Sequence, residues 1–181
     1  MLEKYFAPGS LFSYKGYRNF FISGLIFVLG ASAFPIALAV TVLDNGGDAS
    51  ALGLILASRV LAGTLFMLIG GVWADRLPRK WIMIGADSFR AAICLVLLVV
   101  SANDMPLWAI GLLVFLMGLG DSFGAPAGSA IVPSLLPDHL LPAGNVAKGL
   151  VGKIGTIVGP GLGGLSIAFL GADWTLSLIH I

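Results

Sequence analysis

Residues 51–80 read ALGLILASRVLAGTLFMLIGGVWADRLPRK, a long apolar run that ends in a short basic segment. Between residues 51 and 74 the one charged side chain is Arg59. A helix that crosses a bilayer needs about 20 mostly apolar residues, because its backbone polar groups must hydrogen-bond within their own segment. The stretch therefore predicts a membrane-spanning helix followed by a turn at the membrane surface.

The composition of the whole chain points to the same class. Of the 181 residues, 58% are hydrophobic and 10% are charged, and the mean hydropathy is +1.01, whereas soluble domains carry roughly 25% charged residues. A formal net charge of +1 gives no basic surface, so no nucleic-acid partner is expected. Cys94 is the single cysteine, and His139 has no second histidine or cysteine nearby at ligand spacing, so neither a disulfide framework nor a metal site is expected.

Five apolar stretches in all are long enough to cross a membrane. The connections between them are short and rich in Pro, Gly, Asn and Asp, which favour turns and leave no room for a soluble domain. The predicted fold class is therefore an all-α membrane protein with the lipid bilayer around it. The predicted spans are 19–43, 51–74, 81–101, 106–131 and 145–170.

Basic and acidic residues in the connections and near the ends of the spans fall on opposite sides of the predicted membrane. Lys and Arg are typical of cytoplasmic connections, so we expect a cytoplasmic N-terminus. The basic side holds Lys4, Lys15, Arg18, Arg76, Arg79, Lys80, Lys148 and Lys153. The opposite side holds Asp44, Asp48, Asp104 and Asp173.

The last six residues differ in character from the rest. Residues 176–181 read LSLIHI, which resembles the translation of a transposon-end adapter used in sequencing libraries. We expect residues 1–175 to be the natural transmembrane part, cut as a sixth helix begins after Trp174, and His180 to have no functional meaning. The alternative is a natural apolar terminus.

A loop signature follows the second predicted span. Residues 71–80, GVWADRLPRK, resemble the G-x-x-x-D-R-x-G-R-K/R loop of the major facilitator superfamily. Pro78 stands where that signature usually has glycine, a departure associated with the exporter branch that includes enterobactin-type siderophore and macrolide efflux permeases. The matching residues are Gly71, Asp75, Arg76, Arg79 and Lys80.

The resemblance implies that this cytoplasmic loop has a gating role. A glycine at a helix end allows another helix to approach, and an aspartate there favours the positive end of a neighbouring helix. In the family the loop is thought to hold the two halves of the transporter together in the outward-facing state. We expect Asp75 at a helix end, with Arg76 and Arg79 as its charged partners. The alternative is a topology loop with no gating role, which explains the basic residues but not their spacing from Gly71 and Asp75.

A second signature lies in the fifth predicted span. Residues 155–164, GTIVGPGLGG, resemble the antiporter motif of drug-exporting members of the superfamily. A spacing of four places glycines on one helix face where a partner backbone can approach, and a proline removes a backbone donor and favours a bend. The implied role is a hinge or seal, and the alternative is general packing, because Gly120, Gly124 and Gly128 repeat the spacing. The motif residues are Gly155, Gly159, Pro160, Gly163 and Gly164.

Charged side chains within the predicted spans are candidates for the coupling or substrate pathway, because charge at membrane depth is costly without a cavity or a partner. Asp87 precedes Arg90 by three residues on one helix face, and Asp121 lies at a similar depth, so the three are expected to cluster. Two interpretations are open: one carboxylate exchanges a proton during the transport cycle, or the cluster is a static ion pair that registers the third and fourth helices. Arg59 lies nearer the outer side and is expected to reach toward Asp44 or Asp48, or to contact substrate.

The resemblance as a whole implies a multi-pass protein of the bacterial plasma (inner) membrane. The chain would form most of the N-terminal six-helix half of a twelve-helix transporter, whose missing C-terminal half is its expected partner. The expected function is proton-coupled export of a small amphipathic molecule of drug or siderophore type. The alternatives are import of a sugar or metabolite, and a non-transporting membrane scaffold or sensor. No phosphate loop, cofactor fingerprint or catalytic set is present, so neither enzyme activity nor a cofactor is expected.

Overall fold

The computed structural model describes residues 9–101 and 106–170, with the backbone only at 74, 75, 98, 100, 101 and 170. Every regular element in these ranges is helical. The expected adapter segment 176–181 and the acidic residues Asp104 and Asp173 lie outside the described residues. In chain order the elements are η1 (Leu11–Ser13), α2 (Lys15–Asp44), α3 (Ala49–Arg76), α4 (Arg79–Ser101), α5 (Leu107–Ala130), α6 (Val132–Leu135), η2 (Asp138–Leu140) and α7 (Leu141–Leu170).

Each of the five predicted spans coincides with one long helix. Four of the described helices, α2, α3, α5 and α7, are both long and apolar enough to cross a membrane. The third prediction falls on α4, a helix of 23 residues whose apolar sequence is interrupted by Asp87 and Arg90. Helices α2 and α7 begin four residues before their predicted starts, at Lys15 and Leu141.

The connection between α2 and α3 is a tight turn fixed by local chemistry. Gly46 adopts φ +78°, a conformation that glycine reaches at little cost. Asp48 then caps α3, since its Oδ1 accepts hydrogen bonds from the Ala51 backbone N–H at 2.8 Å and the Ser50 hydroxyl at 2.6 Å. These bonds hold the pKa of the Asp48 carboxyl below its ordinary value, and the bond from the Ser50 hydroxyl has the largest effect.

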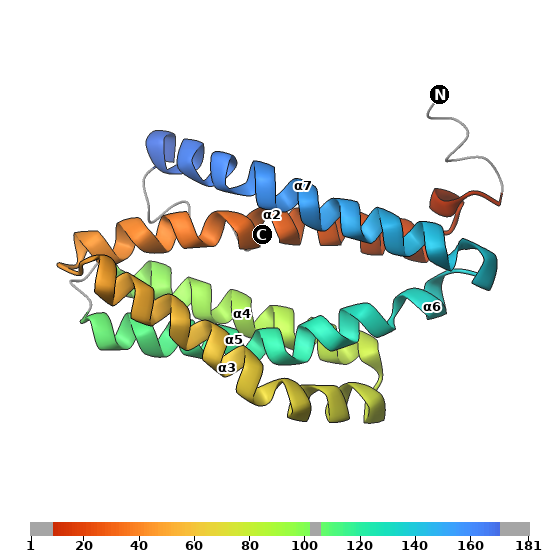
Figure 1. Cartoon of the computed structure of the whole chain (residues 1–181), viewed down its shortest axis with the longest axis horizontal. Coiled ribbons are helices and arrows are strands. Elements are labelled where there is room, and N and C mark those ends of the chain that lie inside the picture. Colours follow the sequence, from red (N-terminus) through yellow and green to blue (C-terminus); the bar gives the residue numbers. More distant parts are fainter. Residues whose placement is uncertain (1–8, 102–105, 171–181) are drawn as a thin grey trace.

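The helices form two layers, which are seen edge-on in Figure 1. Helix α2 packs along α7 in one layer, and α5 packs between α3 and α4 in the other. Glycines make both layers tight: a Cβ at Gly159 would meet Ser32 of α2, and one at Gly118 would meet the Arg59 backbone of α3. Close backbone approach at small residues is typical of helix packing in membranes.

The two layers meet in an apolar core at one end of the molecule. This core joins the second half of α2 to α3, α4 and α5, with Phe34, Leu38, Leu97 and Ile110 almost fully buried. Near the N-terminus of α2 a smaller aromatic cluster forms around Tyr17, whose hydroxyl donates to the Gly144 carbonyl of α7 at 2.7 Å. This second cluster therefore holds α2 and α7 together within their own layer.

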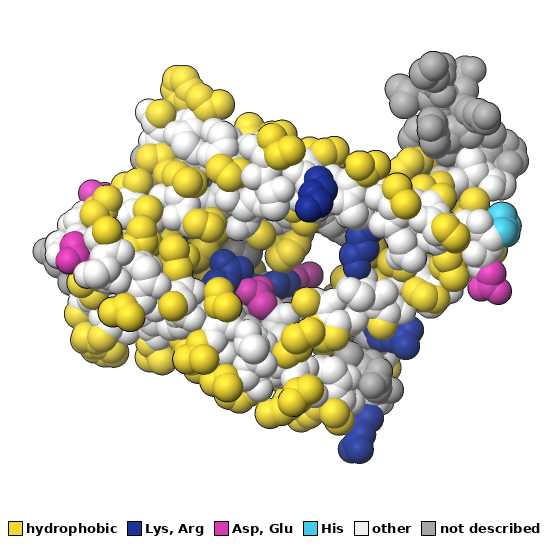
Figure 2. Space-filling model, in the orientation of Figure 1, with side chains coloured by type: hydrophobic (Ala, Val, Ile, Leu, Met, Phe, Trp, Pro, Cys, Tyr) yellow, Lys and Arg dark blue, Asp and Glu magenta, His cyan; other side chains and the backbone are white. Residues whose placement is uncertain are grey.

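Large apolar side chains cover much of the outer surface, as Figure 2 shows for one face. Leu68 and Phe169, for example, are more than 80% exposed. A soluble monomer rarely exposes so much continuous apolar surface. The exposed faces are therefore those that a bilayer would cover.

Candidate functional site

A cavity of about 460 Å³ lies between the two layers, in the volume range of ligand sites in proteins. Figure 2 shows the opening as a hollow near the centre of the molecule, with basic and acidic side chains on its wall. The α2 side of the cavity is rich in aromatic rings, and the side made by α3, α4 and α5 carries two arginines and two aspartates. Its lining includes Tyr17, Phe20, Phe21, Gly24, Phe27, Arg59, Met83, Asp87, Arg90, Asp121, Gly124, Gly128, Lys148, Val151 and Gly152.

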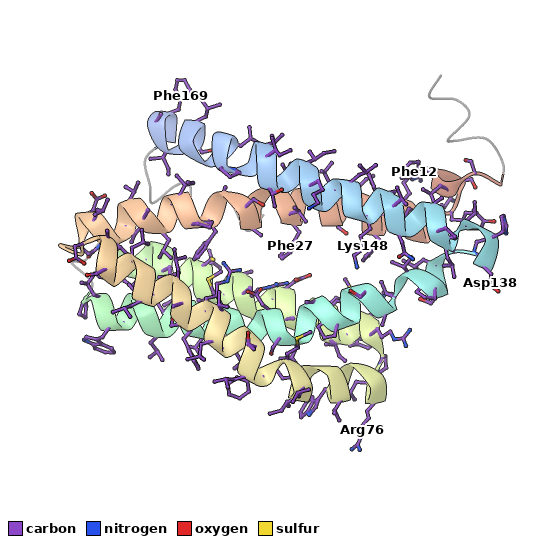
Figure 3. All side chains as sticks on the ribbon, in the orientation of Figure 1. Phe12, Phe27, Arg76, Asp138, Lys148 and Phe169 are labelled. Atoms are coloured by element: carbon purple, nitrogen blue, oxygen red, sulfur yellow. The ribbon has the colours of Figure 1, made fainter. Side chains whose placement is uncertain are left out.

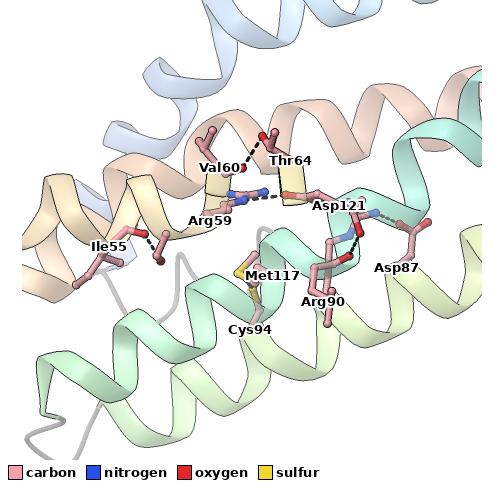
Figure 4. Close-up of polar contacts among 12 residues, drawn as sticks. Ile55, Arg59, Val60, Thr64, Asp87, Arg90, Cys94, Met117 and Asp121 are labelled. Carbon is pink, nitrogen blue, oxygen red and sulfur yellow. Dashed lines mark hydrogen bonds and ion pairs between the residues drawn. The ribbon is translucent and has the colours of Figure 1, made fainter. Parts of the chain in front are cut away.

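Four charged side chains on this wall form a connected network, drawn in Figure 4. Asp121 of α5 receives both arginines: Arg59 Nε donates to its Oδ2 at 2.8 Å, and Arg90 Nη1 donates to its Oδ1 at 2.7 Å. Arg90 also donates through Nη2 to Asp87, one turn earlier on α4. The network therefore joins α3, α4 and α5 through one shared carboxylate.

The position of Arg59 differs from the sequence prediction. The expectation that it reaches outward to Asp44 or Asp48 is wrong, because its guanidinium pairs with Asp121. Arg59 lies eleven residues from Asp48, about 16 Å along the helix axis at 1.5 Å per residue, which is beyond the length of an arginine side chain. A carboxylate on the facing helix is within reach, so the pair forms there.

The two carboxylates of the network lie in different surroundings. The Asp121 side chain is 30% exposed and has both oxygens engaged, whereas the Asp87 side chain is 53% exposed and, within the described part of the chain, has one oxygen engaged. Arg90 is 7% exposed, and its Nε has no hydrogen-bond partner among the described residues. Gly120 and Gly124 make room for it, since a Cβ at either would meet the Arg90 side chain.

Two aromatic rings of α2 face the arginines across the gap between the layers. The Arg90 guanidinium carbon lies 4.5 Å from the centre of the Phe27 ring, and that of Arg59 lies 5.1 Å from the Phe34 ring. A spacing of seven residues places both rings on one face of α2. These cation–π contacts connect the charge network to the α2–α7 layer.

Lys148 is a further charge in the cavity, and the sequence prediction assigned it only to the cytoplasmic side. Figure 3 shows it pointing from α7 into the space between the layers, as Phe27 does from α2. Its Nζ donates to the Gly128 carbonyl at 3.0 Å, and it lies 6.0 Å from the centre of the Phe20 ring. The sequence held one indication of this placement, because Lys148 lies three residues inside the predicted span 145–170.

The two neighbouring glycines near the end of α3 differ in their surroundings. A Cβ at Gly71 would meet no other atom within 4 Å, whereas one at Gly70 would meet the Ser122 backbone of α5. Successive residues point about 100° apart around a helix, so the glycine that faces α5 is Gly70. The helix that the resemblance places against Gly71 belongs to the C-terminal half, so the role of Gly71 stays a prediction.

The basic residues of the loop lie at the surface. Arg79 donates from Nη1 to the Ala130 carbonyl, the last residue of α5, where a cation is favoured by the helix dipole. Arg76 is exposed, and Lys80 lies 5.8 Å from the centre of the Trp81 ring. The Asp75 side chain lies outside the described part, so its expected pairing stays a prediction.

The glycine stripe predicted from the second signature faces α2. Added Cβ atoms at Gly155, Gly159 and Gly163 would meet Val28, Ser32 and Ala33, respectively. Gly164 faces open space, and α7 continues through Pro160 as one helix. The stripe makes the α2–α7 contact, while its role as a hinge or seal stays a prediction.

A sequence profile described as Major Facilitator Superfamily matches residues 20–180, which is most of the chain. The chain belongs to the major facilitator superfamily. Its all-helical, membrane-spanning architecture is that of the superfamily, and the family is one of transporters rather than enzymes. Across the described ranges no three His, Cys, Asp or Glu side chains gather as they would around a metal ion.

Several relatives of this major facilitator superfamily chain carry efflux names. Macrolide efflux protein A of Streptococcus pyogenes is 29% identical over 153 residues, 84% of this chain and 37% of that protein. A protein of the same name from Enterococcus faecalis is 34% identical over 110 residues, 60% of this chain and 33% of that protein. Enterobactin exporter EntS of Salmonella choleraesuis is 26% identical over 173 residues, 92% of this chain and 40% of that protein. The chain thus spans a third to two fifths of the length of these relatives.

Proposed function

We propose that the complete protein is a secondary active exporter of a small amphipathic molecule, driven by proton entry across the bacterial inner membrane. The observation that carries this proposal is the cavity between the helix layers, which has an aromatic wall on α2 and an ion-paired wall on α3, α4 and α5. Membership of a transporter family and the efflux names of the relatives support it. The missing C-terminal half would close the cavity from the other side.

The geometry favours different roles for the two carboxylates. Asp121 is held by arginines of two helices, and both of its oxygens are engaged. Asp87 has one arginine partner and a half-exposed side chain on the cavity wall, where protons and substrate can reach it. Asp87 is therefore the proposed proton carrier, and Asp121 the group that holds α3, α4 and α5 together.

The two signatures supply the proposed moving parts. The loop residues Gly71, Asp75, Arg76, Arg79 and Lys80 lie at the end of the α3–α4 pair, where they would contact the C-terminal half on the cytoplasmic side. The stripe on α7 keeps the α2–α7 layer tight, so this layer would move as one body.

The proposed orientation, with this loop in the cytoplasm, is tested by labelling a cysteine placed at Arg79. Labelling from the inside of the cell supports the orientation, and labelling from the outside would contradict it.

The function is tested by transport in everted membrane vesicles that contain the complete protein. Respiration acidifies the vesicle interior, and a compound exchanged for protons lowers the gradient reported by acridine orange. A macrolide and enterobactin, the compounds in the relatives' names, are the first to test. Proton release and uptake of the compound into everted vesicles support export, whereas movement in the opposite direction supports the importer alternative.

Three variants connect this transport to the cavity. Asp87→Asn is expected to abolish the proton release. Gly152→Leu is expected to block transport, because Gly152 lines the cavity and a Cβ there would meet no atom within 4 Å, so the side chain can occupy the space. Gly161→Leu is the matched control, since Gly161 also faces open space but does not line the cavity. Equal transport by Gly152→Leu and Gly161→Leu would refute the cavity as the substrate site.

A further inference from the structure

The charges on the cavity wall do not balance. Arg59 and Arg90 are matched by Asp87 and Asp121 in three ion pairs. Lys148 adds a third cation, and among the described residues no carboxylate lies within ion-pair distance of it. The cavity therefore carries one positive charge without a counter-ion on the described part of the chain.

The contacts of Lys148 are neutral. Its ammonium group donates to the Gly128 carbonyl at 3.0 Å and approaches the Ser129 hydroxyl at 3.4 Å. These oxygens lie in the last turn of α5, so Lys148 also stabilises that helix end. Neither contact neutralises the charge, and Lys148 lies three residues inside the predicted span 145–170, about 4–5 Å along the helix axis. A cation within an apolar span is costly until a counter-charge arrives.

The wall next to Lys148 suits an apolar body. The rings of Tyr17, Phe20 and Phe21 line the same part of the cavity, and Lys148 lies 6.0 Å from the centre of the Phe20 ring. Gly24 and Gly152 also line the cavity, and a Cβ at either would meet no atom within 4 Å. Space, aromatic surface and a cation thus occur together.

We propose that this cavity takes an amphipathic anion, with its acidic group on Lys148 and its apolar body against the aromatic rings of α2. This inference rests on the proposed function, because it names the substrate class of the same cavity. A cationic ligand would meet carboxylates that already have cationic partners, Arg90 at Asp87 and two arginines at Asp121. An anionic ligand meets Lys148 with no carboxylate to displace among the described residues.

Two probes that share one aromatic body test the charge preference. Pyrenebutyrate is anionic at neutral pH, and pyrenebutanol is its neutral counterpart. Binding of each to the complete protein in lipid nanodiscs is measured by energy transfer from tryptophan, with empty nanodiscs as the reference. We expect the wild type to bind the acid about 10-fold more tightly than the alcohol, because a charge-assisted hydrogen bond is stronger than a neutral one.

Variants assign that preference to Lys148. Lys148→Gln is expected to weaken binding of the acid about 10-fold and to leave binding of the alcohol within about 2-fold, as expected when only the charge-assisted bond is lost. Binding of the alcohol also reports that this variant is folded. Lys148→Arg should keep the preference, and Lys153→Gln, the same charge change on an exposed position of α7, should match the wild type.

The outcomes separate this inference from the proposed function. Equal binding of acid and alcohol by the wild type, or unchanged acid binding by Lys148→Gln, would overturn the anion assignment while the cavity stands as the ligand site. Binding of neither probe, or binding of both that persists in Gly152→Leu, would overturn the cavity as a ligand site and the inference with it.

Discussion

Asp121 is predicted to be the more important carboxylate for the stability of the helix bundle, although Asp87 is the proposed proton carrier. Asp121→Asn keeps the shape of the side chain but removes the charge that two arginines share. Arg90, which is 7% exposed, would then keep only Asp87 as an anionic partner, and Arg59 would lose its recorded ion pair. Asp87→Asn removes a single, half-exposed partner of Arg90.

The expected magnitudes follow from this difference in burial and partners. Breaking a fully buried ion pair costs about 3–5 kcal/mol. The Asp121 side chain is 30% exposed, so solvent screening reduces the expected loss for Asp121→Asn to about 2–3 kcal/mol. The half-exposed Asp87 pair is closer to a surface ion pair, so Asp87→Asn is expected to cost less than about 1 kcal/mol.

The measurement is reversible unfolding of the chain in mixed micelles, titrated with a denaturing detergent and followed by helical circular dichroism. A double-mutant cycle that combines Asp121→Asn with Arg59→Gln then isolates their interaction, which should reach about 1 kcal/mol or more. The reasoning is refuted if Asp87→Asn destabilises the chain as much as Asp121→Asn, or if the cycle shows no coupling between Arg59 and Asp121.

Two further predictions concern neighbouring glycines and a helix cap. Gly70→Ala should lower the free energy of unfolding by about 1–3 kcal/mol, because its Cβ would meet the Ser122 backbone. Gly71→Ala should be neutral or stabilise by up to about 1 kcal/mol. The same detergent titration checks both, and the reverse order of stability would show that α3 is rotated about its axis. Because the folded-state pKa of Asp48 is depressed, its carboxylate stabilises the chain above the ordinary carboxyl pKa, and that contribution is lost as the pH falls through the folded pKa. The wild type should therefore exceed Asp48→Asn in unfolding midpoint at neutral pH but not at strongly acidic pH, and a difference independent of pH would contradict the assignment.

The long helices could be predicted from the sequence because they depend on local properties. An apolar run of sufficient length must satisfy its backbone internally in lipid, whatever its neighbours are. The glycine spacing on α7 was readable for a similar reason, since a period of four fixes a helix face. The short elements α6 and η2 were missed, because three prolines between residues 133 and 142 indicated only a connection.

Contacts between helices could not be predicted to the same extent. The choice between Gly70 and Gly71 depends on how α3 is rotated about its axis, and neighbouring residues in a uniformly apolar helix give no sign of it. The pairing of Arg59 with Asp121 depends on which helices are neighbours, whereas the Asp87–Arg90 pair is local to one helix and could be predicted. Lys148 was read as a topology signal because its place in the cavity appears only when α7 lies beside α2.

The two layers are held together by different kinds of contact from those within each layer. Glycines let backbones touch within the α2–α7 pair and within the α3–α5 pair, and these contacts cannot change without steric clash. Across the cavity, the layers meet through side chains, by the cation–π contacts of Phe27 and Phe34 with the arginines and by the Lys148 hydrogen bond to Gly128. Neutralising Asp121 therefore loosens one layer, whereas neutralising Asp87 changes the charge of the cavity between the layers. This architecture therefore requires two different outcomes. A variant of Asp87 should lose proton coupling at normal stability, and a variant of Asp121 should lose stability.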